Sequence, residues 1–289
     1  MIPITGHTQL TALLGSPVAH SISPLMHNEA FRLLDLDYTY LCFDVNEDDL
    51  ETAVMGLKAC GIRGFNLTMP NKNKIVEFLD QLSPAARLIG AVNTVVNDHG
   101  LLTGYNTDGV GYMQAVKDAG YHIIGKTITI MGAGGAATAI CAQAALDGVE
   151  KIHIFARKTS RFWERTQNLV ENINSTLPCQ AILHENGDKN ALAQAISEST
   201  LLLNATSVGM APNTESTIIE DTSLYHPELV VSDVIYNPQE TRFLREAREA
   251  GCHTFNGMYM LLYQGAEAFR LWTGKEMPVK EIKAKFFAL

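Results

Sequence analysis

The chain carries at residues 128–137 the stretch Ile128-Thr129-Ile130-Met131-Gly132-Ala133-Gly134-Gly135-Ala136-Ala137. An apolar run that breaks into closely spaced glycines predicts a buried strand, a tight turn and the start of a helix. Gly132 suits the turn, and Gly134 lets the main chain approach a phosphate without a Cβ in the way. The helix N-terminus would present unpaired N–H groups to the anion. We therefore predict a dinucleotide cofactor, with the following binding residues: Gly132, Ala133, Gly134, Gly135 and Ala136.

The sequence after this turn completes a βαβ unit. Small and apolar residues predict a helix that ends at Gly148, and a second strand follows at residues 151–155. An NAD site usually has an acidic residue at the end of this strand, whereas this chain has Arg157 and Lys158. Positive charge suits the 2′-phosphate of NADP, so we favour NADP and predict that both residues bind it. NAD stays an alternative, because an arginine can also stack on adenine and both charges could simply be solvated.

Composition limits the classes of function. The chain has 289 residues, of which 46% are hydrophobic and 18% charged, which is enough for two domains with buried cores. A net charge of −9 argues against nucleic acid or an anionic membrane surface as a partner. We find neither a membrane-spanning apolar stretch nor a signal peptide, and we expect a cytoplasmic protein. The five cysteines are scattered, so neither a disulfide framework nor a metal site is expected.

The first 110 residues alternate strand and helix patterns. Ser83-Pro84 has the serine N-cap and the N1 proline of a helix start, and Asn97-Asp98-His99-Gly100 predicts a hairpin turn. Apolar positions between Leu50 and Leu57 have helical spacing. Strands are expected at four short runs: residues 12–15, 38–45, 64–67 and 91–96.

A second α/β series begins near Lys126. It adds a polar helix at residues 159–175 and strands at 200–203 and 229–232, while an apolar helix at 258–266 is expected to pack back on the first domain. The fold class is therefore α/β with two domains. The first is an N-terminal α/β substrate-binding domain, residues 1–110, which residues 255–289 complete. The second is a Rossmann-like, doubly wound nucleotide-binding domain, residues 111–254.

Six polar motifs remain outside this packing pattern, and they occur in one order along almost the whole chain. They are His20-Ser21-Ile22-Ser23-Pro24, Asn66-Leu67-Thr68-Met69-Pro70-Asn71-Lys72, Gly90-Ala91-Val92-Asn93-Thr94, Gly104-Tyr105-Asn106-Thr107-Asp108-Gly109, Asn204-Ala205-Thr206-Ser207-Val208-Gly209, and Gly257 with Gln264-Gly265-Ala266. With these motifs the chain resembles the shikimate dehydrogenases, including the quinate/shikimate dehydrogenase branch. The resemblance implies reversible NAD(P)-dependent reduction of 3-dehydroshikimate to shikimate in the pathway of aromatic amino acids and chorismate.

The resemblance assigns the catalytic roles to Lys72 and Asp108. A positioned ammonium can donate a proton as charge develops on the former carbonyl oxygen, and the neutral amine would accept it in reverse. Asp108 would orient Lys72 and bind a substrate hydroxyl, with proton sharing as a lesser role. Taken singly, Lys72 could be a solvated residue at a helix start and Asp108 an N-cap.

The resemblance also assigns substrate binding. Ser21 and Ser23 would donate to the substrate carboxylate, although Ser23 before Pro24 could also be an ordinary N-cap. Tyr236 would help to hold the same carboxylate. Ring hydroxyls would be bound by three residues: Thr68, Asn93 and Gln264.

Further cofactor contacts are expected where later strands of the second domain end. Thr206, Ser207 and Val208 follow one such strand, and Val234 follows another. Met210 and Gly257 would border the nicotinamide.

Several alternatives stay open at this point. A quinate-preferring or dual enzyme fits the same motifs, and so does a catalytically silent sensor of shikimate-like metabolites, although Lys72 and Asp108 argue against the sensor. A reductase of another small carbonyl acid is the remaining alternative. The resemblance allows a homodimer, but the sequence decides neither the oligomeric state nor the direction of the reaction.

Overall fold

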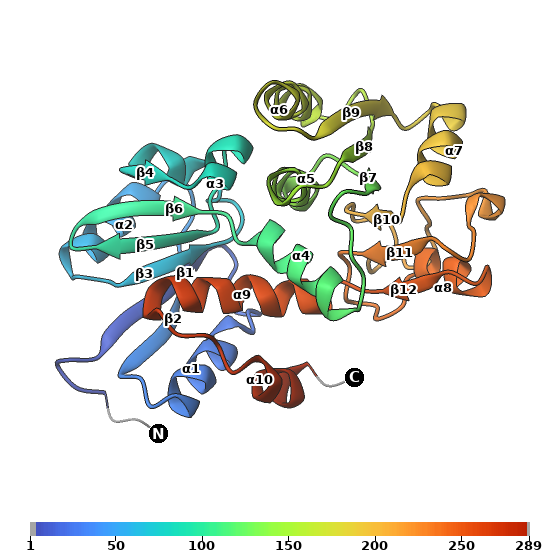
Figure 1. The fold of residues 1–289 in the computed structure, drawn as a ribbon. Helices are drawn as coiled ribbons and strands as arrows, with labels where there is room; N and C mark the ends of the chain where they lie inside the picture. The colour runs from blue at the N-terminus through green and yellow to red at the C-terminus, as the bar shows by residue number, and fades with distance from the viewer. Residues whose placement is uncertain (1–3, 288–289) are drawn as a thin grey trace. The chain divides into compact units, whose positions relative to one another are not determined.

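The computed structural model describes residues 4–287. The chain divides into two compact units: residues 1–111 with 262–289 form the first, and Tyr112–Leu261 the second. Both are α/β, which confirms the predicted fold class (Figure 1). The chain returns to the first unit at Leu262 rather than at residue 255, because His253–Phe255 forms an edge strand of the second sheet.

The first unit is built on a mixed sheet with the strand order β2-β1-β3-β5-β6-β4. β1 pairs in parallel with β2 and β3, whereas β5 runs antiparallel to both β3 and β6. The strands are β1 (Gln9–Gly15), β2 (Tyr38–Asp44), β3 (Gly64–Leu67), β4 (Gln81–Leu82), β5 (Thr94–Asp98) and β6 (Leu101–Tyr105).

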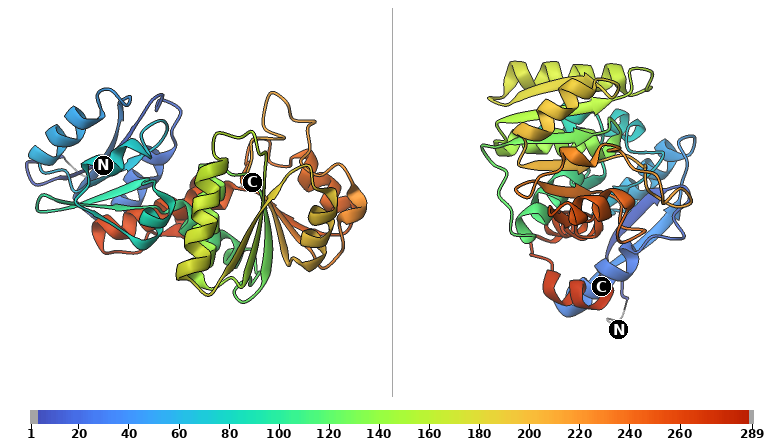
Figure 2. Two further views of the ribbon diagram at one scale, coloured as in Figure 1. Left: turned by 90° about the horizontal axis from the view of Figure 1, so that it is seen from above. Right: turned by 90° about the vertical axis from the view of Figure 1, so that its right-hand side faces the viewer.

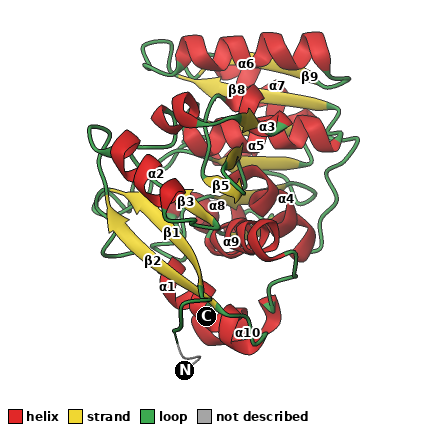
Figure 3. Ribbon diagram, turned by 90° about the vertical axis from the view of Figure 1, so that its left-hand side faces the viewer, coloured by secondary structure: helices red, strands yellow, loops and turns green. Residues whose placement is uncertain are grey.

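Helices enclose the sheet of the first unit. Leu50 and Val54 of α2 pack with Phe65 and Val95 in a buried core on one face. α1 and α10 lie side by side (Figures 1 and 3) and are joined by the Glu29–Lys285 ion pair of 2.9 Å. The helical elements are α1 (Ser23–Leu33), α2 (Leu50–Ala59), the 3₁₀ helix η1 (Lys74–Phe78), α3 (Pro84–Ile89), α4 (Asp108–Asp118), α9 (Met258–Thr273) and α10 (Val279–Phe286); α4 and α9 each continue into the second unit.

Two local predictions are confirmed in this unit. The Ser83 hydroxyl accepts from the backbone N–H of Ala86 and caps α3. At the hairpin between β5 and β6, Asn97 Oδ1 accepts from the backbone N–H of Gly100 at 2.7 Å. His99 and Gly100 both have positive φ, as this tight turn requires.

The second unit is a fully parallel sheet with the order β12-β11-β10-β7-β8-β9. Counted within the unit this order is 6-5-4-1-2-3, the doubly wound Rossmann order. Figure 2 shows helices on both faces of the sheet. The elements are β7 (Thr127–Met131), α5 (Gly135–Asp147), β8 (Lys151–Ala156), α6 (Trp163–Thr176), β9 (Gln180–Glu185), α7 (Lys189–Glu198), β10 (Leu201–Asn204), η2 (Thr222–Leu224), β11 (Val230–Asp233), α8 (Arg242–Glu249) and β12 (His253–Phe255).

The structure corrects the expectation of a helix from residue 159. α6 begins at Trp163, because turns closed by the hydrogen bonds from Ser160 N–H to Arg157 O and from Trp163 N–H to Ser160 O precede it. β9 and β12 were not expected, and both are edge strands.

No helix within residues 4–287 is long and apolar enough to span a membrane.

A buried polar cluster joins the ends of β10 and β11. The Asp233 carboxylate accepts from Asn204 Nδ2 at 3.1 Å, from the backbone N–H of Ile235 at 2.9 Å and from the Thr241 hydroxyl at 2.8 Å. Asn204 Nδ2 also donates to the carbonyl of Val208. Burial raises the pKa of Asp233 to about 6, against these hydrogen bonds, which lower it. The cluster therefore fixes the loops that follow both strands.

We predict that Asp233→Asn changes how stability depends on pH. Between the ordinary pKa of 3.8 and the folded pKa of about 6, the folded protein holds a proton that the unfolded chain has released. Stability from this group is therefore lost as the pH rises through that window. The variant cannot titrate, so the difference between its free energy of unfolding and that of the wild type should be about 2 kcal/mol higher, in favour of the variant, at pH 7.5 than at pH 4.5. Urea unfolding at the two pH values measures this difference, and a difference independent of pH would contradict the assignment.

Candidate active site

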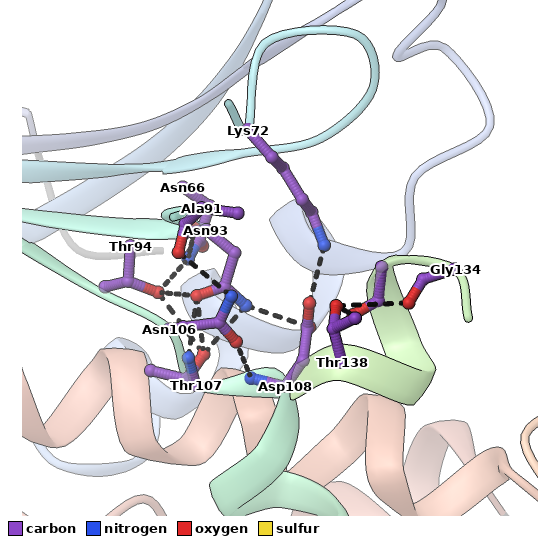
Figure 4. A network of polar contacts seen from close by, with 11 residues as sticks. Asn66, Lys72, Ala91, Asn93, Thr94, Asn106, Thr107, Asp108, Gly134 and Thr138 are labelled. Carbon is purple, nitrogen blue, oxygen red and sulfur yellow. Dashed lines mark hydrogen bonds and ion pairs between the residues drawn. The ribbon is translucent and has the colours of Figure 1, made fainter. Parts of the chain in front are cut away.

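Lys72 and Asp108 form an ion pair in the first unit. Lys72 Nζ lies 2.6 Å from Asp108 Oδ2, and the two side chains are 31% and 15% exposed (Figure 4). Lys72 is in the turn that follows β3. Asp108 is the first residue of α4, and the helix dipole stabilises a carboxylate at that end of a helix. Lys72 is therefore not merely a solvated residue at a helix start. The pair combines a proton donor with a fixed counter-charge.

Asn93 holds Asp108 from the other side. Asn93 Nδ2 donates to Asp108 Oδ1 at 2.9 Å and to the Thr107 hydroxyl at 3.0 Å, while Asn93 Oδ1 accepts from the backbone N–H of Thr107 at 2.8 Å. Figure 4 shows Asn93 between Thr94, Thr107 and Asp108. Asn93 is only 2% exposed. Each carboxylate oxygen of Asp108 thus has its own donor.

Main-chain hydrogen bonds bring these residues together. The carbonyl of Lys72 accepts from the N–H of Val92 at 2.8 Å, and Asn93 N–H donates to the carbonyl of Tyr105 at 3.0 Å. Asn106 Oδ1 then accepts from the N–H of Asp108. Main-chain bonds next to the sheet therefore hold together segments that are distant in the sequence.

The two predicted carboxylate-binding serines lie at the start of α1. The N-cap of α1 is Ile22 and makes no side-chain cap, so the alternative that Ser23 is the N-cap is not supported. Ser21 Oγ accepts from the backbone N–H of Ser23 at 3.2 Å. Both side chains are half-buried, and their role in binding stays a prediction.

The other predicted substrate residues are distributed over both units. Thr68, directly after β3, and Gln264, in α9, are half-buried residues of the first unit. Tyr236 belongs to the second unit, after β11, and is 48% exposed. Its assignment to the carboxylate stays a prediction.

The glycine turn of the second unit has the geometry that a dinucleotide requires. Gly132 has φ of +121°, and a Cβ there would lie 2.9 Å from the carbonyl oxygen of Ala205. Gly134 is the N-cap residue of α5 and makes no side-chain cap. A Cβ on Gly134 or Gly135 would meet no atom within 4 Å. With Ala133 and Ala136, these residues leave the helix N-terminus accessible to an anion, so they fit the predicted cofactor.

The remaining cofactor candidates follow the carboxyl ends of strands in the same sheet. Arg157 and Lys158 are exposed after β8. Thr206, Ser207, Val208 and Met210 lie in the loop after β10, and Val234 follows β11. β7 and β10 are neighbours at the point where the strand order reverses, which is where doubly wound sheets bind ligands. A Cβ on Gly257 would collide with the backbone of Val234, so only glycine fits there.

Sequence reasoning missed the buried residues behind the ion pair. Asn66 lies in the otherwise apolar strand β3 and donates to the Thr94 hydroxyl at 2.9 Å and to the carbonyl of Asn93. Tyr40 donates to Asn66 Oδ1 at 2.8 Å. A polar residue inside a short apolar run was the available signal, since a buried amide is unfavourable without partners.

The sequence is similar to that of known shikimate dehydrogenases. The family model of the shikimate dehydrogenase substrate binding domain matches residues 13–95, and that of the shikimate 5'-dehydrogenase C-terminal domain matches residues 257–285. A shikimate dehydrogenase (NADP(+)) of Listeria monocytogenes (serotype 4b, strain F2365) is 55% identical over 284 residues, which cover 98% of this chain and 97% of the relative.

The fold is also similar to those of solved shikimate and quinate dehydrogenases. The crystal structure of shikimate 5-dehydrogenase from Listeria monocytogenes in complex with shikimate and NAD has a TM-score of 0.95 at 55% identity and covers 97% of each chain. A quinate dehydrogenase from Corynebacterium glutamicum in complex with NAD has a TM-score of 0.85 at 30% identity, covering 98% of this chain and 99% of that one. On this evidence, the chain belongs to the shikimate dehydrogenase family.

Proposed function

We propose that this chain catalyses the reversible, NAD(P)-dependent reduction of 3-dehydroshikimate to shikimate in aromatic amino acid biosynthesis. The observation that carries the proposal is the Lys72–Asp108 pair, 2.6 Å apart and fixed by Asn93. Membership of the shikimate dehydrogenase family supports the choice of substrate. A silent metabolite sensor would have no need of this pair.

Lys72 is the proton donor in the reductive direction. The carbonyl oxygen of the substrate becomes a hydroxyl, so a proton must reach it as negative charge develops. An ammonium has three protons, and the bond to Asp108 occupies one, so Lys72 can donate another to the substrate oxygen. When bound, the nicotinamide cofactor exchanges a hydride with the ring carbon. In the oxidative direction Lys72 takes the proton back.

The substrate is held by neutral donors and acceptors of the first unit. Ser21 and Ser23 bind its carboxylate, and Thr68 and Gln264 bind its ring hydroxyls, because a polyol needs several fixed hydrogen-bonding groups. Asn93 takes part chiefly by holding Asp108, since its amide is buried and bonded on both sides. Tyr236, which the resemblance also assigns to the carboxylate, stays a prediction of the sequence.

The second unit holds the cofactor. The glycine turn from Gly132 binds the pyrophosphate, and Arg157 with Lys158 binds a 2′-phosphate, which favours NADP. The Listeria monocytogenes relative is named as an NADP(+) enzyme, while the crystal structure of shikimate 5-dehydrogenase from Listeria monocytogenes holds NAD. Both cofactors therefore fit the family.

Quinate oxidation is a second candidate activity, since a quinate dehydrogenase is 30% identical over nearly the whole chain.

A cytoplasmic location and a homodimer stay predictions of the sequence.

Initial rates of shikimate and quinate oxidation with NAD⁺ and NADP⁺ test the proposal, together with Lys72→Ala. We expect shikimate turnover, and a decrease in kcat of about 10²- to 10⁴-fold in the variant because it lacks the proton donor and acceptor. Lys74→Ala is the matched control, since Lys74 pairs with Glu77 on the surface, and it should keep its activity. Folded wild-type protein that oxidises neither acid with either cofactor would contradict the proposal.

Substitution of the basic residues after β8 tests the preference for NADP. Arg157→Ala and Lys158→Ala should each raise KM for NADP⁺ by about tenfold and change KM for NAD⁺ by less than about threefold, because only NADP⁺ carries the 2′-phosphate. Lys126→Ala, an exposed lysine before the amino end of β7, is the control. Equal effects on both cofactors would rule out a 2′-phosphate site.

A further inference from the structure

A chain of hydrogen bonds runs from the Lys72–Asp108 pair into the buried part of the first unit (Figure 4). From Asp108 it passes through Asn93 and Thr94 to Asn66. The last three residues are enclosed, and their exposed fractions are 2%, 0% and 7%, respectively. Polar groups enclosed in this way have to satisfy one another, so each proton of the chain has a defined acceptor.

The side-chain amide of Asn93 has one orientation. The backbone N–H of Thr107 can only donate, and it lies 2.8 Å from Asn93 Oδ1. The carboxylate of Asp108 accepts from Asn93 Nδ2 at 2.9 Å. An amide turned by half a rotation would place its oxygen against the carboxylate. The donors around Asn93 Oδ1 therefore keep the N–H₂ end on Asp108.

The side-chain amide of Asn66 has one orientation too. The main-chain carbonyl of Asn93 can only accept, and it lies 3.1 Å from Asn66 Nδ2. At the other end of the amide, the Tyr40 hydroxyl donates to Asn66 Oδ1 at 2.8 Å. Asn66 Nδ2 also lies 2.9 Å from the hydroxyl oxygen of Thr94. Asn66 therefore donates to Thr94, and the Thr94 proton has to point elsewhere.

Thr94 passes this direction on to Asn93. Asn93 Oδ1 lies 3.1 Å from the Thr94 hydroxyl oxygen, closer than the Thr107 hydroxyl at 3.3 Å, so Asn93 receives the Thr94 proton. This bond adds to the one from the backbone N–H of Thr107 on the same oxygen. An amide whose oxygen accepts becomes a stronger N–H donor, because hydrogen bonds in a chain polarise one another.

We propose that Thr94 is a positioning residue for the proton transfer between Lys72 and the substrate. Its hydroxyl, directed by Asn66, holds the Asn93 amide and strengthens the bond from Asn93 to Asp108. Asp108 in turn keeps Lys72 in place. Thr94 is fully buried, so it acts through Asn93 and does not touch the substrate. This inference rests on the proposed function, since it takes Lys72 as the proton donor.

Thr94→Val tests the role of the hydroxyl. The variant keeps the shape of the side chain and loses one hydrogen bond to Asn93, so kcat for shikimate oxidation should fall by about three- to tenfold. KM for shikimate should stay within about twofold, because the residues proposed to bind the carboxylate are unchanged. Thr11→Val is the matched control and should change neither constant. Thr11 is also a fully buried strand threonine of the first unit, but its hydroxyl donates to the carbonyl of Thr39, outside the chain.

Thr94→Ser separates hydrogen bonding from packing. Serine keeps the hydroxyl and loses only the methyl group, so kcat should stay within about twofold of the wild type. A packing role predicts the reverse order, since valine fills the space of threonine and serine leaves a cavity. A larger fall in kcat for Thr94→Ser than for Thr94→Val would overturn the inference.

Combination with Asp108→Asn tests whether Thr94 acts through Asp108. Adding Thr94→Val to Asp108→Asn should lower kcat further by less than about 1.5-fold, because the Lys72–Asp108 pair that Thr94 supports is already lost. A further fall of about three- to tenfold in that background would mean that the two residues act independently, and it would overturn the inference.

Neutron diffraction of the wild-type protein tests the direction of the hydrogen bonds without an activity measurement. The Thr94 deuteron should face Asn93 Oδ1; a deuteron that faces Asn66 or Thr107 would overturn the inference, even in an active enzyme. Wild-type protein that does not oxidise shikimate would overturn the proposed function and this inference with it. Wild-type turnover with an unchanged kcat in Thr94→Val would overturn the inference alone.

Discussion

The hydrogen bond from Asn93 to Asp108 is the constraint on which the site depends. A lysine side chain has many conformations, and a carboxylate at a helix start could rotate freely, so proximity in the fold alone would not make an acid–base pair. Asn93 removes this freedom by occupying one oxygen of Asp108 and leaving the other to Lys72 at 2.6 Å. Asn93 is itself fixed by Thr107 and by the strands around it. The hydrogen bonds around Asn93 therefore determine where the Lys72–Asp108 pair lies.

The two units divide the requirements of a dehydrogenase between them. The first unit provides the ion pair and the hydroxyl groups that we propose to bind the substrate, on a mixed sheet with a buried polar network. The second provides a parallel sheet whose neighbouring strand ends, at Gly132 and Ala205, approach so closely that a Cβ would not fit. Membership of the shikimate dehydrogenase family agrees with both halves. A carboxylate and several hydroxyls can be recognised by neutral groups, so the site remains compatible with a chain of net charge −9.

Sequence patterns predicted what is local and missed what depends on tertiary pairing. The glycine turn, the Ser83 cap and the hairpin at Asn97 depend on neighbouring residues. The fold class followed from the alternation of strand and helix patterns along the chain. β9 and β12 were missed because they are edge strands with polar residues, which interrupt the apolar pattern of a buried strand. The ordered motifs identified Lys72 and Asp108. Tyr40 gave no signal, because an aromatic residue is ordinary in a strand and its partners meet only when β1, β2, β3 and β5 pair.

The kcat of Asp108→Asn in shikimate oxidation tests the central claim most directly. The substitution keeps the shape of the side chain and an oxygen for Asn93, but it turns an amide N–H₂ toward the Lys72 ammonium, so donor faces donor. We predict that kcat falls by at least about 100-fold while the dissociation constant for NADP⁺ stays unchanged, since the proposed cofactor residues belong to the second unit. A kcat within about threefold of the wild type would show that Asp108 does not position Lys72 for proton transfer.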